Sequence, residues 1–369
     1  MSTEDFDWEK WIPERMQKGT PYTPGEQRNT SDWIKLNTNE FPYAPSPRVL
    51  EAIQLGVDRL RLYPNPTGES LREAIGEYHG VSAEQVVIFN GCDDALNCCI
   101  RGFTEPGESI GMLNPSYSLY QTLIKNHGAK LNHVEYEADF AFPVEALIAD
   151  ESKVFIFTSP NAPSGRAFSK AELAEVLGRR EGIVVLDETY AEFSDWTAID
   201  LISEYPNVMV VRSFSKTFGL AGMRVGYAIG APEAVNVLHL IRDVYNVNHL
   251  SQLAAEAAIR DTSYYSQKVN ELVETREKLC MFLSEKLKWK CVPSSTNFLF
   301  FYPSLMGGEP SPATAKSLFS FLVEQKVLLR YFPNHSLVES GLRMSIGTAA
   351  QMETVCNLIE KWVNREQQK

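Results

Sequence analysis

The sequence lacks the features that mark several classes of protein. It contains no CxxC pair and no HExxH motif, and its six cysteines and six histidines form no cluster at metal-ligand spacing. We therefore expect free thiols and no bound metal. It has no run of lysine and arginine, and its formal net charge is -12, which argues against nucleic-acid and anionic-membrane partners. Any anion must be bound by a few placed arginines.

Long apolar runs are also absent. No stretch is apolar over the length that a bilayer requires, and the start MSTEDFDWEKWIPER is acidic, unlike a signal or transit peptide. We therefore expect a cytoplasmic protein.

The length and the order of apolar runs predict two domains. From residue 86, strand patterns alternate with helical patterns, which predicts right-handed crossovers and a largely parallel sheet covered on both faces. After about residue 245 the pattern changes to long helices and shorter strands, typical of a smaller α+β unit. We assign 1–40 to an N-terminal arm and the start of the small domain, 41–245 to the large domain and 246–369 to the small C-terminal domain. The expected strands of the large domain lie at 86–89, near Ile110, and at 153–158, 183–186, 208–211 and 225–229.

The segment VMVVRSFSKTFGLAGMRVG, which begins at Val208, carries a distinctive chemical pattern. A buried strand pattern ends at Ser213, and Lys216 follows in a loop of small residues and hydroxyls that Arg224 closes. A lysine can form a Schiff base with an aldehyde, while hydroxyls and an arginine bind phosphate. Pyridoxal phosphate carries both groups. An exposed loop lysine beside a structural arginine is the alternative for this segment taken alone.

Two interpretations fit GIVVLDETY, a buried strand pattern that ends in Asp187 and Glu188. A Walker B strand of a P-loop ATPase also ends in Asp-Glu, but the chain contains no GxxxxGK(S/T) loop. In a pyridoxal-phosphate enzyme, an aspartate at a strand end can keep the pyridine nitrogen protonated, and Tyr190 can donate to the phenolate oxygen. The second interpretation therefore stands.

Other strand ends carry residues of the same kind. NGCDDALN joins a strand to a helix, so the N-H groups near Cys92 and Asp93 can bind phosphate, or an aspartate can simply cap the helix. Tyr117 in NPSYSLY can stack on a flat cofactor or belong to the core. Asn161 is the only side-chain amide in the turn SPNAPSG. Because ligands bind at the carboxyl ends of parallel strands, these features converge on one edge of one sheet.

A strand of the small unit carries an arginine. In GLRMSIG the apolar residues alternate with Arg343 and Ser345, so Arg343 points to the other face of the strand. An arginine on a rigid strand can bind an anion or can form a surface ion pair.

Together these motifs resemble those of the fold-type-I pyridoxal-phosphate aminotransferases, and among them the histidinol-phosphate aminotransferases. The resemblance implies an α/β fold with a large domain, built on a mostly parallel sheet, and a smaller α+β domain. It extends from about Tyr22 to Thr348. It includes LNTNEFP, YPNP, GCDD, SPNAPSG, VVLDETYAEF, SFSKTFGLAGMRVG and GLRMSIGT.

The resemblance gives each site residue a role. Lys216 becomes the Schiff-base lysine, Asp187 the partner of the pyridine nitrogen and Tyr190 the donor to the phenolate oxygen. Tyr63 would reach the cofactor phosphate of a neighbouring subunit, which implies a homodimer. Arg343 would bind the substrate anion. The remaining assignments are the cofactor-phosphate contacts Ser213, Ser215, Arg224 and the backbone at Cys92 and Asp93, the ring contact Tyr117, the cofactor contact Asn161, and the substrate contacts Arg330 and Tyr22.

The resemblance also implies a reaction, in which histidinol phosphate and 2-oxoglutarate give imidazole acetol phosphate and glutamate in histidine biosynthesis. An aromatic aminotransferase and a threonine-phosphate-type decarboxylase are the alternatives. A non-catalytic regulator would need a DNA-binding segment, and the short acidic N-terminus offers none.

One position departs from the family pattern. The family has an asparagine directly before the proline of the turn, where it donates to the phenolate oxygen, but this chain has Ala162. The loss of that donor leaves Tyr190 alone unless Asn161 takes its place.

Overall fold

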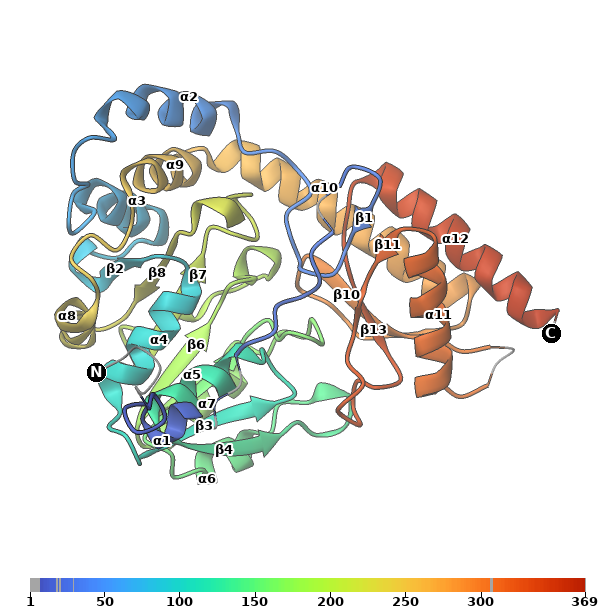
Figure 1. The fold of residues 1–369 in the computed structure, drawn as a ribbon, viewed down its shortest axis with the longest axis horizontal. Helices are drawn as coiled ribbons and strands as arrows, with labels where there is room; N and C mark the ends of the chain where they lie inside the picture. The colour runs from blue at the N-terminus through green and yellow to red at the C-terminus, as the bar shows by residue number, and fades with distance from the viewer. Residues whose placement is uncertain (1–6, 18, 20, 29, 306–307, 369) are drawn as a thin grey trace.

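Two units, each built around its own sheet, lie side by side and are linked by the long helix α10 (Figure 1). The computed structural model describes residues 7–17, 19, 21–28, 30–305 and 308–368. The larger sheet has seven strands in the order β2-β8-β7-β6-β5-β3-β4. β8 runs antiparallel to both of its neighbours, whereas the other adjacent pairs are parallel. The mostly parallel sheet predicted from the sequence is thus confirmed.

The strands of this sheet follow the apolar runs closely. They are β2 (Val86–Phe89), β3 (Ser109–Asn114), β4 (Lys130–Glu135), β5 (Val154–Thr158), β6 (Ile183–Asp187), β7 (Val208–Ser213) and β8 (Gly226–Ile229). The apolar pattern does not reveal β4, because this edge strand is largely exposed and its sequence KLNHVE contains no apolar run.

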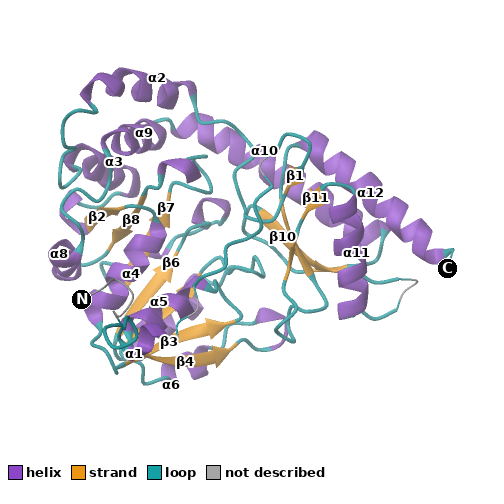
Figure 2. Ribbon diagram, in the orientation of Figure 1, coloured by secondary structure: helices purple, strands orange, loops and turns teal. Residues whose placement is uncertain are grey.

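The central strands are buried on both faces, which explains their Val-, Ile- and Phe-rich sequences. In β5, Val154 and Ile156 belong to one core, and Phe155 and Phe157 belong to the other. Figure 2 shows helices on both sides of the sheet. Of the helices around this sheet, three bury residues in the first core: α4 (Cys92–Phe103), α5 (Leu119–His127) and α8 (Pro232–Ile241). The second core continues into the smaller unit, and the helices around the large sheet that bury residues in it are α2 (Pro47–Gly56), α3 (Glu69–His79), α6 (Val144–Ala149), α7 (Lys170–Arg179) and α9 (His249–Arg260).

The smaller unit is built on a four-stranded antiparallel sheet in the order β12-β13-β10-β9. A short parallel pair joins it to the N-terminal arm, because Ile34 of β1 aligns with Val327 of β11. The fully buried Trp362 anchors the last helix in this unit. Its elements are β9 (Lys290–Cys291), β10 (Phe298–Tyr302), β11 (Val327–Leu328), β12 (Arg330–Tyr331), β13 (Leu342–Ser345), α10 (Thr262–Met281), α11 (Pro312–Glu324) and α12 (Ala349–Gln367), and the arm carries α1 (Glu14–Gln17) and β1 (Ile34–Lys35).

Helix α9 lies beyond residue 245, where the sequence predicts that the small domain begins. It nevertheless packs against α2 and α3, beside the larger sheet. Its buried residues Ala254, Ala255 and Ala258 allow this close approach between helices. The helices around the larger sheet therefore extend further along the chain than the change of pattern indicates.

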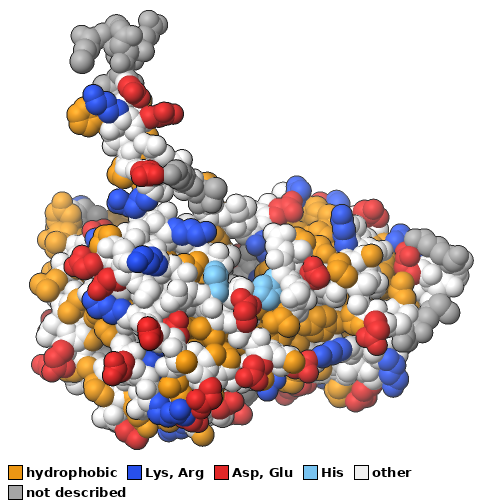
Figure 3. Space-filling view, turned by 90° about the horizontal axis from the view of Figure 1, so that it is seen from below, with side chains coloured by type: hydrophobic (Ala, Val, Ile, Leu, Met, Phe, Trp, Pro, Cys, Tyr) orange, Lys and Arg blue, Asp and Glu red, His pale blue; other side chains and the backbone are white. Residues whose placement is uncertain are grey.

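The surface carries charges of both signs. On the face shown in Figure 3, acidic and basic side chains are interspersed. In the described part of the chain, no helix combines the length and the apolar character that crossing a membrane requires.

Candidate active site

A cavity of about 390 Å³ lies where the carboxyl ends of the large-sheet strands meet the N-terminal arm and the small unit. Its walls include the arm around Asn39, the loop that carries Lys216, and Arg343 of β13. All but two of the residues predicted for the site line this cavity. The predicted residues that line it are Tyr22, Cys92, Asp93, Tyr117, Asp187, Tyr190, Ser213, Ser215, Lys216, Arg224, Arg330 and Arg343.

Lys216 follows the end of β7, and its amine is inside the protein. The Nζ atom donates a hydrogen bond to the carbonyl oxygen of Thr38 at 2.9 Å. Burial, together with the positive charge of Arg343, lowers the pKa of the Lys216 amine to about 8. An amine with this pKa is partly unprotonated near neutral pH, and it can therefore act as a nucleophile.

Asp187 is the last residue of β6 and is buried. Its Oδ2 accepts a hydrogen bond from the Tyr120 hydroxyl at 2.7 Å, and its Oδ1 accepts the backbone N-H of Thr189 at 3.0 Å. Burial raises the pKa of this carboxyl group, and the hydrogen bonds oppose that effect. The carboxylate is thus held in one orientation. Tyr120 had no recognisable signal in the sequence, since an aromatic residue on α5 fits a helix core equally well.

Hydrogen-bond donors gather at the start of helix α4. No side chain caps the first turn of this helix, so the N-H groups near Cys92 and Asp93 remain available. Gly91 has φ 87°, and a Cβ atom there would lie 2.7 Å from Nη2 of Arg224. A side chain at position 91 would therefore displace the guanidinium from its place beside the helix, where Nη2 lies 3.1 Å from Oδ2 of Asp93. Ser213, whose Oγ accepts the N-H of Ser215 at 3.1 Å, lies on the same wall.

Two arginines of the small unit face the same cavity. Arg330 of β12 and Arg343 of β13 are register partners in the antiparallel pair. Arg343 donates from Nη2 to the carbonyl oxygen of Asn37 at 2.9 Å and packs over the rings of Phe298 and Phe332. Burial lowers the pKa of Arg343 to about 10, and the charge of Arg330 contributes. Within the described residues, neither arginine forms an ion pair with a carboxylate.

Three tyrosines, Tyr22, Tyr117 and Tyr190, complete the lining of the cavity. Tyr22 of the arm meets Tyr117 edge-to-face with 6.1 Å between ring centroids, and Tyr117 meets Tyr120 at 5.5 Å. Tyr190 accepts a hydrogen bond at Oη from Nδ2 of Asn39 at 2.9 Å. Burial raises the pKa of the Tyr190 phenol to about 12, so the hydroxyl keeps its proton at neutral pH.

Asn161 is one of the two predicted residues that the structure does not bring to the cavity. It is fully buried, with Nδ2 donating to the Tyr136 hydroxyl at 2.7 Å and Oδ1 accepting the Ser164 hydroxyl at 2.7 Å. Ala162 and Pro163 line the cavity instead. Asn161 therefore does not replace the amide that is missing at position 162, because its own polar atoms are already paired.

Tyr63 is the second predicted residue that lies outside the cavity. Its side chain is 81% exposed and stacks on Tyr245, with 4.5 Å between the ring centroids. It is absent from the lining of the cavity in its own chain.

Comparison with known proteins identifies the family. The family model described as Aminotransferase class I and II matches residues 31–359. The histidinol-phosphate aminotransferase of Synechocystis sp. is 39% identical over 332 residues, which cover 90% of this chain and 92% of the relative. That of Geotalea daltonii is 41% identical over 342 residues, covering 92% and 96%. This chain belongs to the class I and II aminotransferase family.

A solved structure confirms the fold of this aminotransferase. The histidinol-phosphate aminotransferase from Sinorhizobium meliloti in complex with pyridoxal-5'-phosphate matches it with a TM-score of 0.87 at 22% identity, covering 96% of this chain and 98% of that one. The α/β fold class, the enzyme class and the pyridoxal-phosphate cofactor predicted from the sequence are thus confirmed.

The cavity of the aminotransferase fits this cofactor. A buried amine suits its aldehyde, a buried carboxylate suits its pyridine nitrogen, and the donors at the start of α4 suit its phosphate. In the described part of the chain, the buried atoms of cavity residues that lack a hydrogen-bond partner include Oδ1 of Asn37, Oγ1 of Thr38 and Nε of Arg343. Unpaired buried atoms are expected where a polar ligand completes a site.

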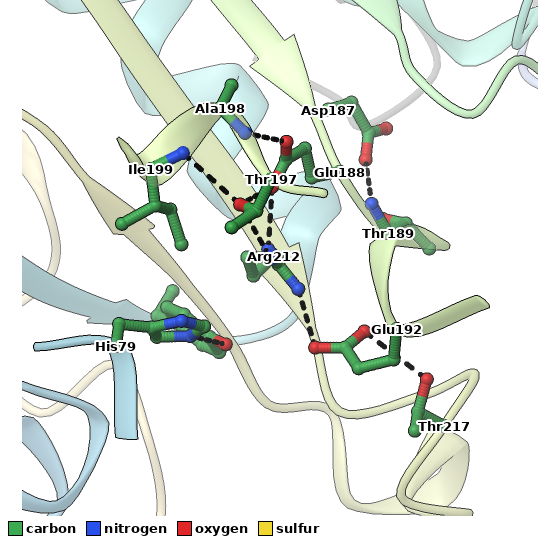
Figure 4. A network of polar contacts seen from close by, with 11 residues as sticks. His79, Asp187, Glu188, Thr189, Glu192, Thr197, Ala198, Ile199, Arg212 and Thr217 are labelled. Carbon is green, nitrogen blue, oxygen red and sulfur yellow. Dashed lines mark hydrogen bonds and ion pairs between the residues drawn. The ribbon is translucent and has the colours of Figure 1, made fainter. Parts of the chain in front are cut away.

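A buried ion-pair network lies next to Asp187 and Thr189 of the aminotransferase's cavity (Figure 4). Arg212 of β7 contacts Glu188 at 2.9 Å and Glu192 at 2.5 Å, and all three side chains are at most 10% exposed. Glu192 also accepts the hydroxyl of Thr217 at 3.3 Å. Glu188 follows Asp187 and Thr217 follows Lys216 in the chain. The network therefore ties the loop after β6 to the loop after β7.

Replacing Arg212 by methionine is expected to lower the free energy of unfolding by about 3–5 kcal/mol, because Glu188 and Glu192 would stay buried without their cation. Urea unfolding of the cofactor-free protein measures this loss. The matched control is Arg179→Met, which removes a guanidinium that is 48% exposed in its ion pairs and is expected to change the stability far less, because water screens exposed ion pairs. Equal losses in the two variants would contradict a structural role for the network.

Proposed function

We propose that this aminotransferase acts on histidinol phosphate, with 2-oxoglutarate and glutamate as the other substrate pair. The observation that carries the proposal is the pair Arg330 and Arg343, two guanidinium groups without a carboxylate partner among the described residues, in the cavity that also holds Lys216. The activity named for the relatives supports the same substrate.

The arginine pair suits a phosphate ester. Two like charges held as cross-strand neighbours repel each other, and an anion with more than one negative charge relieves this repulsion best. A planar guanidinium binds a carboxylate or a phosphate through two parallel hydrogen bonds. One site can therefore bind the carboxylate of glutamate in one half-reaction and the phosphate of histidinol phosphate in the other. We assign Arg343 to this anion, with Arg330 and Tyr22 assisting the larger phosphate.

We assign the cofactor contacts as follows. When bound, pyridoxal phosphate supplies an electron sink next to the reacting carbon of the substrate. Asp187 holds a proton on the pyridine nitrogen, and Tyr190 donates its hydroxyl hydrogen to the phenolate oxygen. Lys216 anchors the cofactor and, once its amine is free, carries a proton to or from the substrate carbon. The cofactor phosphate is held by Ser213, Ser215, Arg224 and the N-H groups at Cys92 and Asp93, and Tyr117 packs on the ring.

Two other activities have some support. A threonine-phosphate-type decarboxylase would use the same anion site, and release of carbon dioxide without formation of a keto acid identifies it. The substrates of an aromatic aminotransferase would also fit a cavity that Tyr22 and Tyr117 line, because these rings pack on phenyl as well as on imidazole.

A cytoplasmic location stays a prediction from the sequence.

We also propose that the enzyme is a homodimer in which Tyr63 reaches the partner's cofactor phosphate. Its hydroxyl has no role in its own chain's cavity, and exposed apolar side chains accompany it on α2, the turn after α2 and the end of α8. Apolar residues exposed in such number are typical of an interface. They are Leu50, Leu55, Val57, Leu60, Leu62, Leu240 and Val244.

The arginine pair is expected to act unequally on the two half-reactions. Arg343→Lys keeps the charge but loses the paired hydrogen bonds. For both glutamate and histidinol phosphate, kcat/KM should therefore fall roughly 10- to 100-fold, which corresponds to a loss of about 1.5–3 kcal/mol of transition-state stabilisation. Arg330→Ala should lower kcat/KM for histidinol phosphate more than for glutamate. Single-turnover kinetics of each half-reaction measure these changes. If Arg330→Ala affected both donors equally, its assignment to the phosphate would be wrong.

The lowered pKa of Lys216 predicts how cofactor uptake depends on pH. Cofactor-free enzyme is expected to attach pyridoxal phosphate faster as the pH rises, with a midpoint near pH 8, because the neutral amine is the nucleophile. Stopped-flow absorbance gives the rate, and the mass of the borohydride-reduced protein verifies covalent attachment. Lys216→Ala should show no attachment. A midpoint near 10.5, the ordinary lysine value, would mean that the amine is not buried as described.

The homodimer predicts complementation between two damaged chains. When Lys216→Ala and Tyr63→Ala chains are co-expressed, one site of each mixed dimer has both its own Lys216 and the partner's Tyr63. Activity should therefore exceed the sum of the two parent variants. Activity equal to that sum, measured with the mixed dimers isolated by two affinity tags, would rule out a shared site.

A further inference from the structure

Asn39 joins three parts of the molecule at the edge of the cavity. It belongs to the arm, is 2% exposed and has φ 55°, a left-handed conformation that asparagine adopts more readily than most residues. Its side chain contacts Ser345 of the small unit and Tyr190 of the large unit. Asn297 donates a further hydrogen bond from Nδ2 to the Asn39 carbonyl oxygen at 2.9 Å.

The orientation of the Asn39 amide follows from the hydrogens available. The Asn39 N-H donates to Oγ of Ser345, and that hydroxyl donates its own hydrogen to Oδ1 of Asn39, both at 2.9 Å. Nδ2 must then face the Tyr190 hydroxyl, 2.9 Å away. With the amide reversed, the buried Ser345 hydroxyl would donate to nothing in the described part of the chain, and an unpaired buried hydrogen is unfavourable.

This orientation leaves the Tyr190 hydroxyl with one free hydrogen. An amide NH₂ group can only donate, so Oη of Tyr190 is the acceptor of this contact. No other described residue accepts the hydrogen of Tyr190, and the residue lines the cavity. The hydrogen is therefore free to be donated into the cavity.

We propose that Asn39 is a positioning residue that makes Tyr190 a hydrogen-bond donor towards the phenolate oxygen of the cofactor. The inference rests on the role proposed for Tyr190. It bears on Ala162, which stands where the family has an asparagine that donates to the phenolate oxygen, and Asn161 cannot replace that donor because it is paired with other residues. Tyr190 is then the donor that remains. If an acceptor replaced the Asn39 amide, the Tyr190 hydroxyl would donate its hydrogen to that acceptor and not to the cofactor.

Two substitutions separate the amide from the backbone. Asn39→Asp has nearly the same shape, but its carboxylate only accepts, so it should draw the Tyr190 hydrogen away from the cavity. Asn39→Gly keeps the left-handed backbone and removes the side chain, which leaves the hydrogen free to point either way. We expect kcat to fall roughly 100-fold for Asn39→Asp, as when one donor to a developing oxyanion is lost, and less for Asn39→Gly.

The decisive measurement is made on the resting holoenzyme, without turnover. A donor stabilises the ionised phenol of the cofactor, so losing it should raise the pH midpoint of the cofactor's absorbance change by on the order of one unit. Tyr190→Phe and Asn39→Asp should both raise the midpoint. Because the new carboxylate also acts through its charge, Asn39→Asp is measured in the Tyr190→Phe background too. In that double variant the new carboxylate keeps its charge but the Tyr190 hydroxyl is gone, so Asn39→Asp should shift the midpoint less than it does in the enzyme that retains Tyr190.

The outcomes distinguish the two hypotheses. An equal shift from Asn39→Asp in both backgrounds would overturn the inference about Asn39 and leave the role of Tyr190 intact. An unchanged midpoint in Tyr190→Phe would overturn the proposed role of Tyr190 itself, and the inference with it.

Discussion

The site depends on positive charges that are partly withdrawn from water and that have no carboxylate partner among the described residues. Lys216 and Arg343 both lie within the protein and both have lowered pKa values because burial disfavours their charged forms. Arg330 adds a third cationic group to the same cavity. Unpaired charges held away from water are unfavourable, so the surrounding structure must hold these cations in place. An anionic ligand therefore stabilises the protein as it binds.

The fold provides that support from three directions. Parallel strands bring Asp187 and Lys216 to one edge of the large sheet, and the Arg212 network ties their loops together. The strand pair β12-β13 presents both arginines from the small unit. The arm closes the cavity between the two units, with the carbonyl oxygens of Asn37 and Thr38 accepting hydrogen bonds from Arg343 and Lys216. Neutral carbonyl oxygens orient these cations without neutralising them, which leaves their charge for the ligand.

Strand ends were predictable from the sequence, whereas contacts between distant segments were not. Lys216 and Asp187 follow long apolar runs, so the pattern places them at the carboxyl edge of the sheet. Asn161 follows such a run too, but the direction of its amide depends on Tyr136, which no local pattern reveals. The contact between Asn39 and Tyr190 spans 151 residues. Asn39 lies in the turn-rich motif LNTNEFP, but nothing in the motif indicates which hydroxyl its amide meets.

The comparison of amino donors tests the central claim most directly. With 2-oxoglutarate as the acceptor, kcat/KM is measured for histidinol phosphate, phenylalanine, tyrosine and threonine phosphate. The two arginines predict a larger value for histidinol phosphate than for phenylalanine or tyrosine, and the proposed activity predicts that its keto product forms without release of carbon dioxide. A larger kcat/KM for phenylalanine would contradict the assignment of the arginine pair to a phosphate and identify an aromatic aminotransferase.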